Sequence, residues 1–480
     1  MRARFPLASL AAALALSGCM NLAPRYEQPI APVPTAWPSA AMQPANATVA
    51  VPALTGWRDF FVDTRLREVV ALALQNNRDL RVSTLNIERA RAIYGIQSAA
   101  ALPTFDIGAG ASRGRTPGGL TTNGQPRISE SFSADLGLTA YELDFFGRVR
   151  NLSEAALQDF FTTEETRRSA QISLVSSVAA AWLQLATDQQ RLQLARDTLA
   201  NQRRSFDLVR RANELGAQSG VAVAQSQTTV ESARADVAAY DALVEQDRNA
   251  LALLVGASVP AELLPGSATD VVSLLPAPPA ELPSSVLQQR PDVLAAEHAL
   301  RASNADIGAA RAAFYPRIAL TGSAGVASSS LGDLFQGSSR AWSFGPSISL
   351  PIFDGGARRN SLRAAEVQRD IQIATYEKTI QTAFREVADA LAARRTLAER
   401  LDAQRALVAA STRSFDLAQA LFKGGSGSYL DVLDAQRTLY GAQQSLISLQ
   451  LTEQGNRLTL YKVLGGGWSE QTPAPAATAG

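Results

Sequence analysis

The chain has 480 residues, and its 45 basic and 44 acidic side chains leave a formal charge of +1. This balance gives no reason to expect a nucleic acid as a partner. A single Cys and a single His exclude an internal disulfide, argue against a zinc site of the usual kind, and provide no Ser/His/Asp or Cys/His set for catalysis. We therefore expect no enzyme activity, no cofactor and no metal site.

Residues 1–18 have the features of an export signal peptide. Arg2 and Arg4 are followed by an apolar stretch that is too short to cross a membrane. Cys19 follows Leu16-Ser17-Gly18, and this pattern resembles the site at which bacterial lipoproteins are cleaved and acylated. We expect Cys19 to begin the mature chain and to carry a lipid that anchors it. The alternative is an ordinary signal peptide followed by an unrelated cysteine.

The next two segments are an extended region and a first structural unit. Residues 19–62 are rich in Pro, Ala and Thr and have no apolar period, which predicts a lipid-anchored, extended N-terminal segment. The first structural unit covers residues 63–255. It begins with a helix for which Asp63 is a candidate N-cap. Two strands follow, joined by a loop rich in Gly, Pro and Asn around residues 114–126.

A long helix is predicted from about Asn151 to Ala212, because this stretch contains neither Pro nor Gly. Some of its residues alternate in spacing between three and four, which is typical of the seam of a coiled coil. They are Ile172, Val175, Ala179, Trp182, Ala186 and Gln189. A returning helix follows Gly216 and Gly220 and ends near Val255.

The second half of the chain repeats this order. Residues 256–283 are rich in Pro and are expected to be an equatorial linker. The second unit covers residues 284–464 and has a helix, two strands, a long helix and a returning helix. Gly424, Gly425 and Gly427 separate the last two helices. Residues 465–480 are expected to be a disordered tail.

Two pairs of matching segments show that the chain is a tandem duplication with an offset of about 210 residues, far longer than a solenoid repeat. Leu102-Pro103-Thr104-Phe105 corresponds to Tyr315-Pro316-Arg317-Ile318. Ser205-Phe206-Asp207-Leu208 recurs as Ser414-Phe415-Asp416-Leu417. Each copy therefore consists of a strand, a second strand and a long helix.

The strands alternate with period two, which places alternate residues on opposite faces of a sheet. In the second copy Ile318, Leu320, Ala324 and Val326 alternate with Arg317, Thr321, Ser323 and Gly325. An apolar face opposite a face of small polar residues suits a membrane barrel with an aqueous lumen. Four strands cannot close a barrel in lipid, so several chains must share one. Three chains would contribute twelve strands.

The chain resembles TolC-like outer-membrane factors, in the lipoprotein branch of OprM- and NodT-type efflux channels. Five motifs carry this resemblance besides Cys19. They are Tyr141-Glu142-Leu143-Asp144-Phe145-Phe146-Gly147-Arg148-Val149-Arg150, Arg290-Pro291-Asp292, Ala312-Ala313-Phe314-Tyr315-Pro316, Pro351-Ile352-Phe353-Asp354-Gly355-Gly356 and Tyr429-Leu430-Asp431-Val432-Leu433-Asp434-Ala435-Gln436-Arg437.

The resemblance implies a mainly α-helical homotrimer in the bacterial outer membrane. Its 12-stranded β-barrel would be continued by a periplasmic coiled-coil barrel. The expected partners are outer-membrane lipid, a periplasmic adaptor protein and an inner-membrane RND-type pump. The expected function is passive exit of drugs or other small toxic solutes. The alternatives are the duct of a type I protein secretion system and a structural envelope lipoprotein with coiled coils.

The resemblance also implies a gate. Leu430, Asp434 and Arg437 are spaced four and three apart, so they share one helix face. Positions matching these three close the resting channel in the family. The residues alone favour a solvated ion pair worth at most about 0.5 kcal/mol. The two hairpin tips are marked by glycines, which permit tight turns. These tips are also expected to be the surface on which the adaptor docks. The glycines are Gly216, Gly220, Gly424, Gly425 and Gly427.

Overall fold

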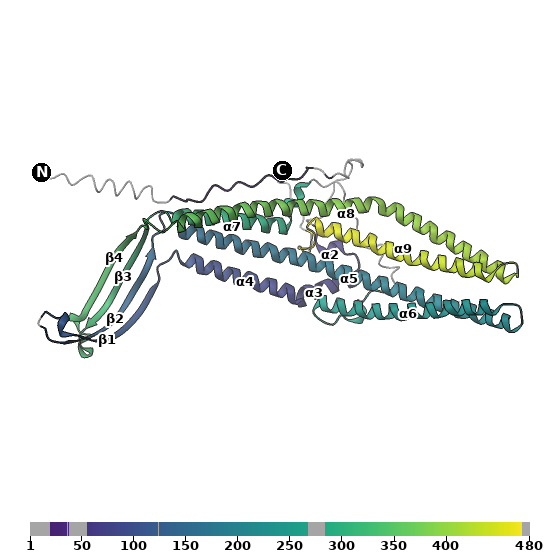
Figure 1. The fold of residues 1–480 in the computed structure, drawn as a ribbon, viewed down its shortest axis with the longest axis horizontal. Coiled ribbons are helices and arrows are strands. Elements are labelled where there is room, and N and C mark those ends of the chain that lie inside the picture. The colour runs from purple at the N-terminus through teal and green to yellow at the C-terminus, as the bar shows by residue number, and fades with distance from the viewer. Residues whose placement is uncertain (1–19, 36, 38–54, 123, 267–283, 473–480) are drawn as a thin grey trace. The chain divides into compact units, whose positions relative to one another are not determined.

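The computed structural model describes residues 20–35, 37, 55–122, 124–266 and 284–472 (Figure 1). The signal peptide and Cys19 lie outside these ranges. The chain divides into two compact units. Unit 1 is built from the residues in ranges 1–30, 86–164 and 295–376, and unit 2 from those in 31–85, 165–294 and 377–480.

Unit 1 contains a four-stranded antiparallel sheet with the order β1-β2-β3-β4 (Figure 1). The strands are β1 Phe105–Thr116, β2 Arg127–Glu142, β3 Arg317–Ser328 and β4 Arg340–Ser349. The pairing of β2 with β3 joins the two copies of the duplicated unit. Among the described residues β1 and β4 each pair on one side only, which leaves both edges of the sheet open there.

The register of the strands places the apolar residues on one face. Residues opposite each other in an antiparallel pair point to the same side of the sheet. Apolar residues therefore line up across all four strands, as in Ile107–Leu136–Ala324–Trp342. On the other face Gly137 lies opposite Ser323, and Ser323 lies opposite Ser343. A bulge between Leu138 and Tyr141 shifts the register near the end of β2.

Helices continue the chain from the strands. In unit 1 the sheet is accompanied by α7 Pro291–Ala312 and by the adjacent parts of α4 Arg78–Ala99, α5 Arg148–Glu214 and α8 Ala357–Lys423. Unit 2 contains α2 Trp57–Phe60, α3 Thr64–Asn76, α6 Gly220–Val255, α9 Tyr429–Val463 and the rest of α5 and α8. α5 and α8 each have 67 residues, and α6 and α9 have 36 and 35, which confirms the duplication.

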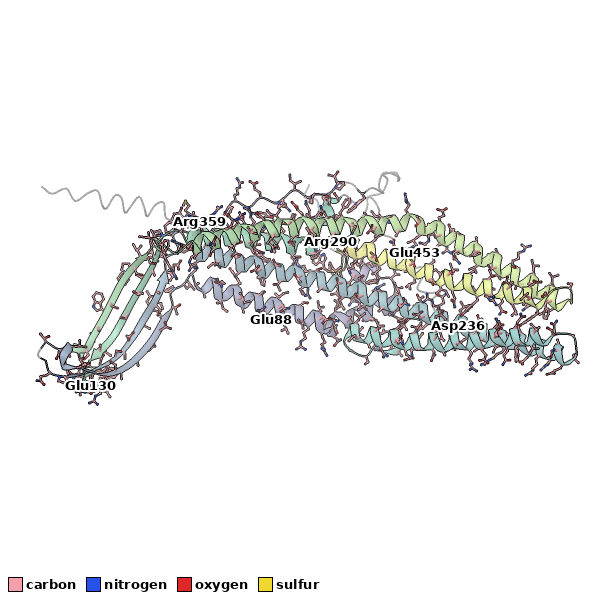
Figure 2. All side chains as sticks on the ribbon, viewed as in Figure 1. Glu88, Glu130, Asp236, Arg290, Arg359 and Glu453 are labelled. Atoms are coloured by element: carbon pink, nitrogen blue, oxygen red, sulfur yellow. The ribbon has the colours of Figure 1, made fainter. Side chains whose placement is uncertain are left out.

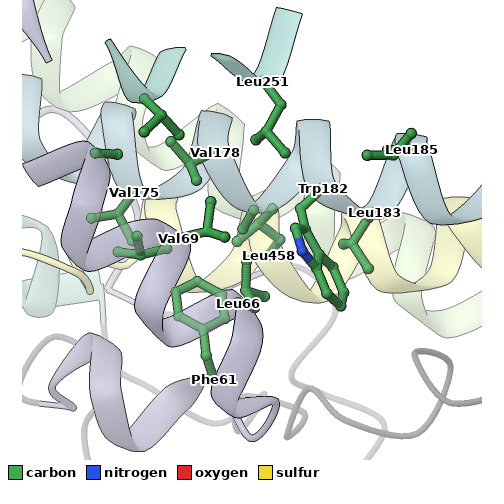
Figure 3. Packing of buried hydrophobic residues seen from close by; sticks show 14 of the residues in the cluster. Phe61, Leu66, Val69, Val175, Val178, Trp182, Leu183, Leu185, Leu251 and Leu458 are labelled. Carbon is green, nitrogen blue, oxygen red and sulfur yellow. The ribbon is translucent and has the colours of Figure 1, made fainter. Parts of the chain in front are cut away.

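The core of unit 2 lies where α3, α5, α6 and α9 meet (Figure 3). Trp182 is fully buried, and its indole nitrogen donates to Leu263 O at 3.1 Å. The predicted seam residues from Val175 to Ala186 are buried in this core, Ile172 is buried outside it, and Gln189 is half-buried. α5 also holds an 18-residue stretch apolar enough to cross a membrane, but most of it is buried inside the protein. The stretch therefore serves as core.

The predicted helix start at Asp63 is correct. The Asp63 carboxylate accepts hydrogen bonds from the backbone N–H of Arg65 at 2.7 Å and of Leu66 at 3.3 Å. These donors have no partner within the helix, and the side chain of the N-cap supplies one. The single helix expected after Asp63 is divided into α3 and α4 at Asn77.

Two expectations need correction. The tail does not lack structure from its start, because the backbone N–H of Trp57 donates to Ser469 O at 3.0 Å, and Gly466 packs against Tyr461. Residues 473–480 lie outside the described ranges. The segment at 19–62 is not extended throughout, because Trp57–Phe60 form α2. The large rings of Trp57, Phe60 and Phe61 are buried in the core, which fixes both segments.

Candidate functional site

The outer faces of the sheet are the first candidate site. Several large apolar side chains on the apolar face are exposed, with Ile107 88% and Trp342 81% accessible. On the polar face Ser323 and Ser343 hydrogen-bond to each other at 2.8 Å, and Thr139 donates to Asp106 at 2.9 Å. One face therefore suits a hydrocarbon environment and the other suits water.

The two helical hairpins of unit 2, α5/α6 and α8/α9, have matching tips. Gly216 and Gly425 are 209 positions apart and have φ angles of 76° and 78°, a left-handed conformation that favours glycine. Ser219 and Ser428 cap the returning helices, each through its side-chain oxygen. The tips are therefore two copies of one turn.

The other three tip glycines differ in whether their surroundings leave room for a Cβ atom. A Cβ on Gly427 would lie 2.8 Å from Leu421 Cβ, so this position is crowded. A Cβ on Gly220 would meet nothing within 4 Å, and one on Gly424 would have ordinary contact at 3.4 Å or more. Gly220 and Gly424 thus have no steric requirement for glycine in this chain.

Leu430, Asp434 and Arg437 are all exposed on α9, while Val432, Leu433 and other residues between them are buried. Asp434 lines a hollow of about 430 Å³ beside α8. Arg437 lines a separate hollow of about 310 Å³ beside α5 and α6. The two charged side chains therefore lie on different flanks of α9. Within the described residues neither makes an ion pair, so the solvated intrahelical pair is not formed.

Two tyrosines of α9 connect the hairpins. The buried Tyr429 hydroxyl hydrogen-bonds to Ser226 Oγ on α6 at 2.9 Å. One turn beyond Arg437, the Tyr440 hydroxyl donates to Asp236 Oδ2 at 3.1 Å; Asp236 is labelled in Figure 2. Burial raises the pKa of both hydroxyls, so they stay protonated at neutral pH. No local sequence pattern indicates these partners, which are more than 200 residues apart.

Exposed leucines near the tips were also missed. Leu208 on α5 and Leu417 on α8 are 209 positions apart, and both are more than half exposed. Val221 and Leu430 form a second pair with the same offset and similar exposure. The repeated Ser-Phe-Asp-Leu segment was a signal for the first pair, because it brings the same apolar residue to the same place on both hairpins.

The N-terminal segment lies along unit 1 from residue 20 onward. Asn151 Nδ2, in the first turn of α5, donates to Asn21 Oδ1 at 2.9 Å, and Asn304 Nδ2 donates to Pro24 O at 2.8 Å. A Cβ on Gly308 would come within 2.8 Å of Ala23 Cβ, so the absence of a side chain there admits the segment. These contacts fix the chain two residues after Cys19.

In the described ranges no three His, Cys, Asp or Glu side chains gather in a way that would hold a metal ion. The single histidine, His298, lies half-buried with its Nδ1 at 2.7 Å from Gln158 Oε1. Burial lowers its pKa, which is the behaviour of a neutral packing residue.

Sequence and structure comparisons identify the class of protein. Residues 69–257 and 282–466 match the family described as outer membrane efflux protein, and the chain belongs to this family. The two matched ranges coincide with the two copies of the duplicated unit. The chain is therefore a non-enzymatic protein of the bacterial outer membrane with a TolC-like fold and a periplasmic helical part.

Individual members of the family and one solved structure are similar to this chain over almost its whole length. The chain is 46% identical over 467 residues to the antibiotic efflux pump outer membrane protein ArpC of Pseudomonas putida, covering 97% of this chain and 96% of ArpC. The toluene efflux pump outer membrane protein TtgC of the same species gives the same values. The open state of the MtrE channel of Neisseria gonorrhoeae superposes with a TM-score of 0.86 at 38% identity, covering 95% and 100% of the two chains.

Proposed function

We propose that this chain forms the outer-membrane channel of a tripartite efflux pump, through which drugs or other small toxic solutes leave the cell passively. The observation that carries the proposal is the four-stranded sheet, which has an apolar face, a face of small polar residues and two open edges. A sheet with unpaired edges is not stable in lipid, so copies must join edge to edge. Three copies give twelve strands and a lumen wide enough for solutes.

Exposed apolar residues on the helices that adjoin the edge strands support this assembly. α4 leads into edge strand β1, and it exposes Val82, Leu85, Ile93 and Ile96. α8 follows edge strand β4, and it exposes Val367 and Ile371. When β1 of one copy pairs with β4 of the next, α4 of the first lies beside α8 of the second. Such head-to-tail contacts close into a ring.

The gate of this channel would be formed by Leu430, Asp434 and Arg437. Because Asp434 and Arg437 make no ion pair among the described residues, each is available to pair with the opposite charge of a neighbouring subunit. Gln225 and Thr228 stand at the matching positions of α6. The charges therefore belong to only one of the two hairpins in each subunit, α8/α9. Opening then consists of moving the α8/α9 hairpins apart when the adaptor and pump dock.

Docking and anchoring complete the proposal. The tip glycines and the exposed Leu208 and Leu417 form two similar surfaces, which suits the hairpins of a periplasmic adaptor attached to an RND-type pump. A lipid on Cys19 would anchor the chain in the outer membrane. The contact of Asn21 with the first turn of α5 supports this placement, since α5 begins just after β2.

The proposal is tested with the purified full-length protein. We expect an outer-membrane extract to show a heat-modifiable trimer on gels, and liposomes containing it to leak small solutes. A water-soluble monomer would instead favour a structural coiled-coil lipoprotein. Loss of protein export, with unchanged drug resistance, in a strain lacking the gene would favour a secretion duct.

A further inference from the structure

The starts of α4 and α7 make the same contact in the two copies. Asn77 immediately precedes α4, and its Nδ2 donates to Leu254 O at 2.8 Å, at the end of α6. Arg290 immediately precedes α7, and its Nη1 donates to Val463 O at 2.7 Å, at the end of α9. The last carbonyls of a helix lack partners within the helix. In each copy this residue therefore holds the base of the hairpin's returning helix.

The second copy has the charged Arg290 where the first has the neutral Asn77. Arg290, labelled in Figure 2, is only 9% exposed. It makes a bidentate contact with Asp292, at 3.0 and 2.7 Å, and a further bond to Glu386 Oε2 at 3.0 Å. Glu386 belongs to α8 and Val463 to α9. One planar side chain thus holds both helices of one hairpin at their base, a geometry that lysine cannot reproduce.

Asn77, the neutral residue at the matching position, contacts fewer helices than Arg290 does. The side chain of Asn77 bonds to Leu254 O and to the backbone N–H of Leu80 at 2.8 Å, which is on its own helix. Neither of these bonds reaches α5. The base of the α5/α6 hairpin is therefore held by Asn77 on one helix only, whereas Arg290 bridges both helices of the α8/α9 hairpin.

The hairpin that Arg290 holds is the one that carries Asp434 and Arg437. About 29 residues of α9 separate Val463 from Asp434, which is roughly 45 Å along a helix axis. A small loosening at the base is therefore enlarged at the tip. Pro291 restricts the backbone of Arg290, the residue that precedes it.

We propose that Arg290 is a positioning residue that makes α8 and α9 move as one body, anchored at their base, so that the hairpin tips stay together until the channel is opened. This inference rests on the proposed gate at Asp434 and Arg437. Arg290 lies far from the gate. Its charge is present at the base of the α8/α9 hairpin, which would move, and is replaced by the neutral Asn77 at the base of the α5/α6 hairpin, which would stay fixed.

The test measures single-channel conductance and thermal dissociation of the purified trimer. Glu386→Gln and Arg290→Gln should raise conductance several-fold by loosening the hairpin, and Arg290→Lys should give an intermediate value. The matched control Asn77→Ala should lower thermal stability without raising conductance. If Arg290→Gln does not fold, Glu386→Gln and Arg290→Lys still decide the outcome.

A combined variant separates an anchor from a purely structural residue. In a background of Asp434→Ala with Arg437→Ala, Glu386→Gln should add nothing to conductance, because the anchor acts through the gate. The inference is overturned if the gate variant raises conductance while Glu386→Gln and Arg290→Lys do not. If the gate variant has no effect either, the proposed gate fails and the inference fails with it.

Discussion

Asp434 and Arg437 show how little an i,i+3 spacing decides at the scale of single residues. Other charged pairs at this spacing or at i,i+4 would be read in the same way from the sequence, and several, such as Arg191 with Asp188, do pair. Asp434 and Arg437 do not, because they line different flanks of α9. Unpaired charges on an exposed helix face are available to another subunit.

We expect Asp434→Ala combined with Arg437→Ala to raise single-channel conductance above the wild-type value, because the contacts that hold neighbouring tips together are lost. Planar-bilayer recording of the purified trimer measures this. Gln225→Ala with Thr228→Ala, at the matching positions of the first copy, is the control and should leave conductance unchanged. An unchanged conductance in the Asp434/Arg437 variant would place the gate elsewhere.

A pair of carboxylates, Asp188 buried and Asp247 half-buried, gives a pH-dependent prediction. Asp188 on α5 is 2% exposed and bonds to Arg191, and Asp247 of α6 lies against it. Desolvation, followed by the hydrogen bond and negative charge of Asp188, raises the pKa of Asp247 from 3.8 to about 6, while Arg191 acts in the opposite direction. Between these two pKa values the folded state binds more protons than the unfolded one. The contribution of Asp247 to the free energy of unfolding therefore falls as pH rises.

Asp247→Asn should therefore stabilise the protein at neutral pH, by no more than about 2 kcal/mol because the site is partly solvated. The advantage should shrink as pH falls from about 6 towards 4, where the wild-type carboxyl becomes neutral too. Thermal unfolding midpoints of both proteins over this range measure it. Asp241→Asn, which removes an exposed carboxylate from the same helix, should not reproduce the pattern; a gain independent of pH would contradict the assignment.

At the scale of elements, the duplication gives two hairpins that have the same turn but carry different charges. Gly216 and Gly425, Ser219 and Ser428, and Leu208 and Leu417 are preserved between the copies, so backbone and tip surface are the same. The charges differ at the proposed gate positions and at the hairpin base. The shared features suit docking of one partner to both tips, and the differences suit movement of one hairpin.

The docking surface is tested by removing its apolar residues. Leu208→Ser and Leu417→Ser should each weaken retention of the periplasmic adaptor, by about 1 kcal/mol or more if the leucines are central to the interface, which is roughly fivefold in affinity. Crosslinking in cells followed by co-purification measures this. Leu243→Ser, a less exposed position further along α6, is the control. Equal retention in all three variants would rule out these leucines as docking residues.

At the scale of the whole molecule, the open edges of the sheet mean that a single chain cannot form a closed barrel. Its apolar face needs lipid, and its edge strands need partners. Folding of the strands is therefore tied to assembly and to the membrane, whereas the helical core around Trp182 is complete within one chain.

The two faces of the sheet are distinguished by a pair of adjacent substitutions. Phe344→Lys places a charge on the apolar face and should cost about 2–4 kcal/mol in the middle of a bilayer. Ser343→Lys places the same charge on the polar face and should be tolerated. The yield of heat-modifiable trimer in outer-membrane extracts measures both, and equal yields would contradict the assignment of the faces.

The sequence by itself determined the elements, the duplication and the two faces of the strands. These follow from local patterns: Gly at the tips, Asp63 before α3, absence of Pro and Gly in the long helices, and alternation in the strands. It did not determine that the tail returns to Trp57, that Asp434 and Arg437 stay unpaired, or that Arg290 and Asn77 make equivalent contacts. Those facts depend on which distant segments meet, and a one-dimensional pattern contains no information about the partner of a polar group 170 residues away.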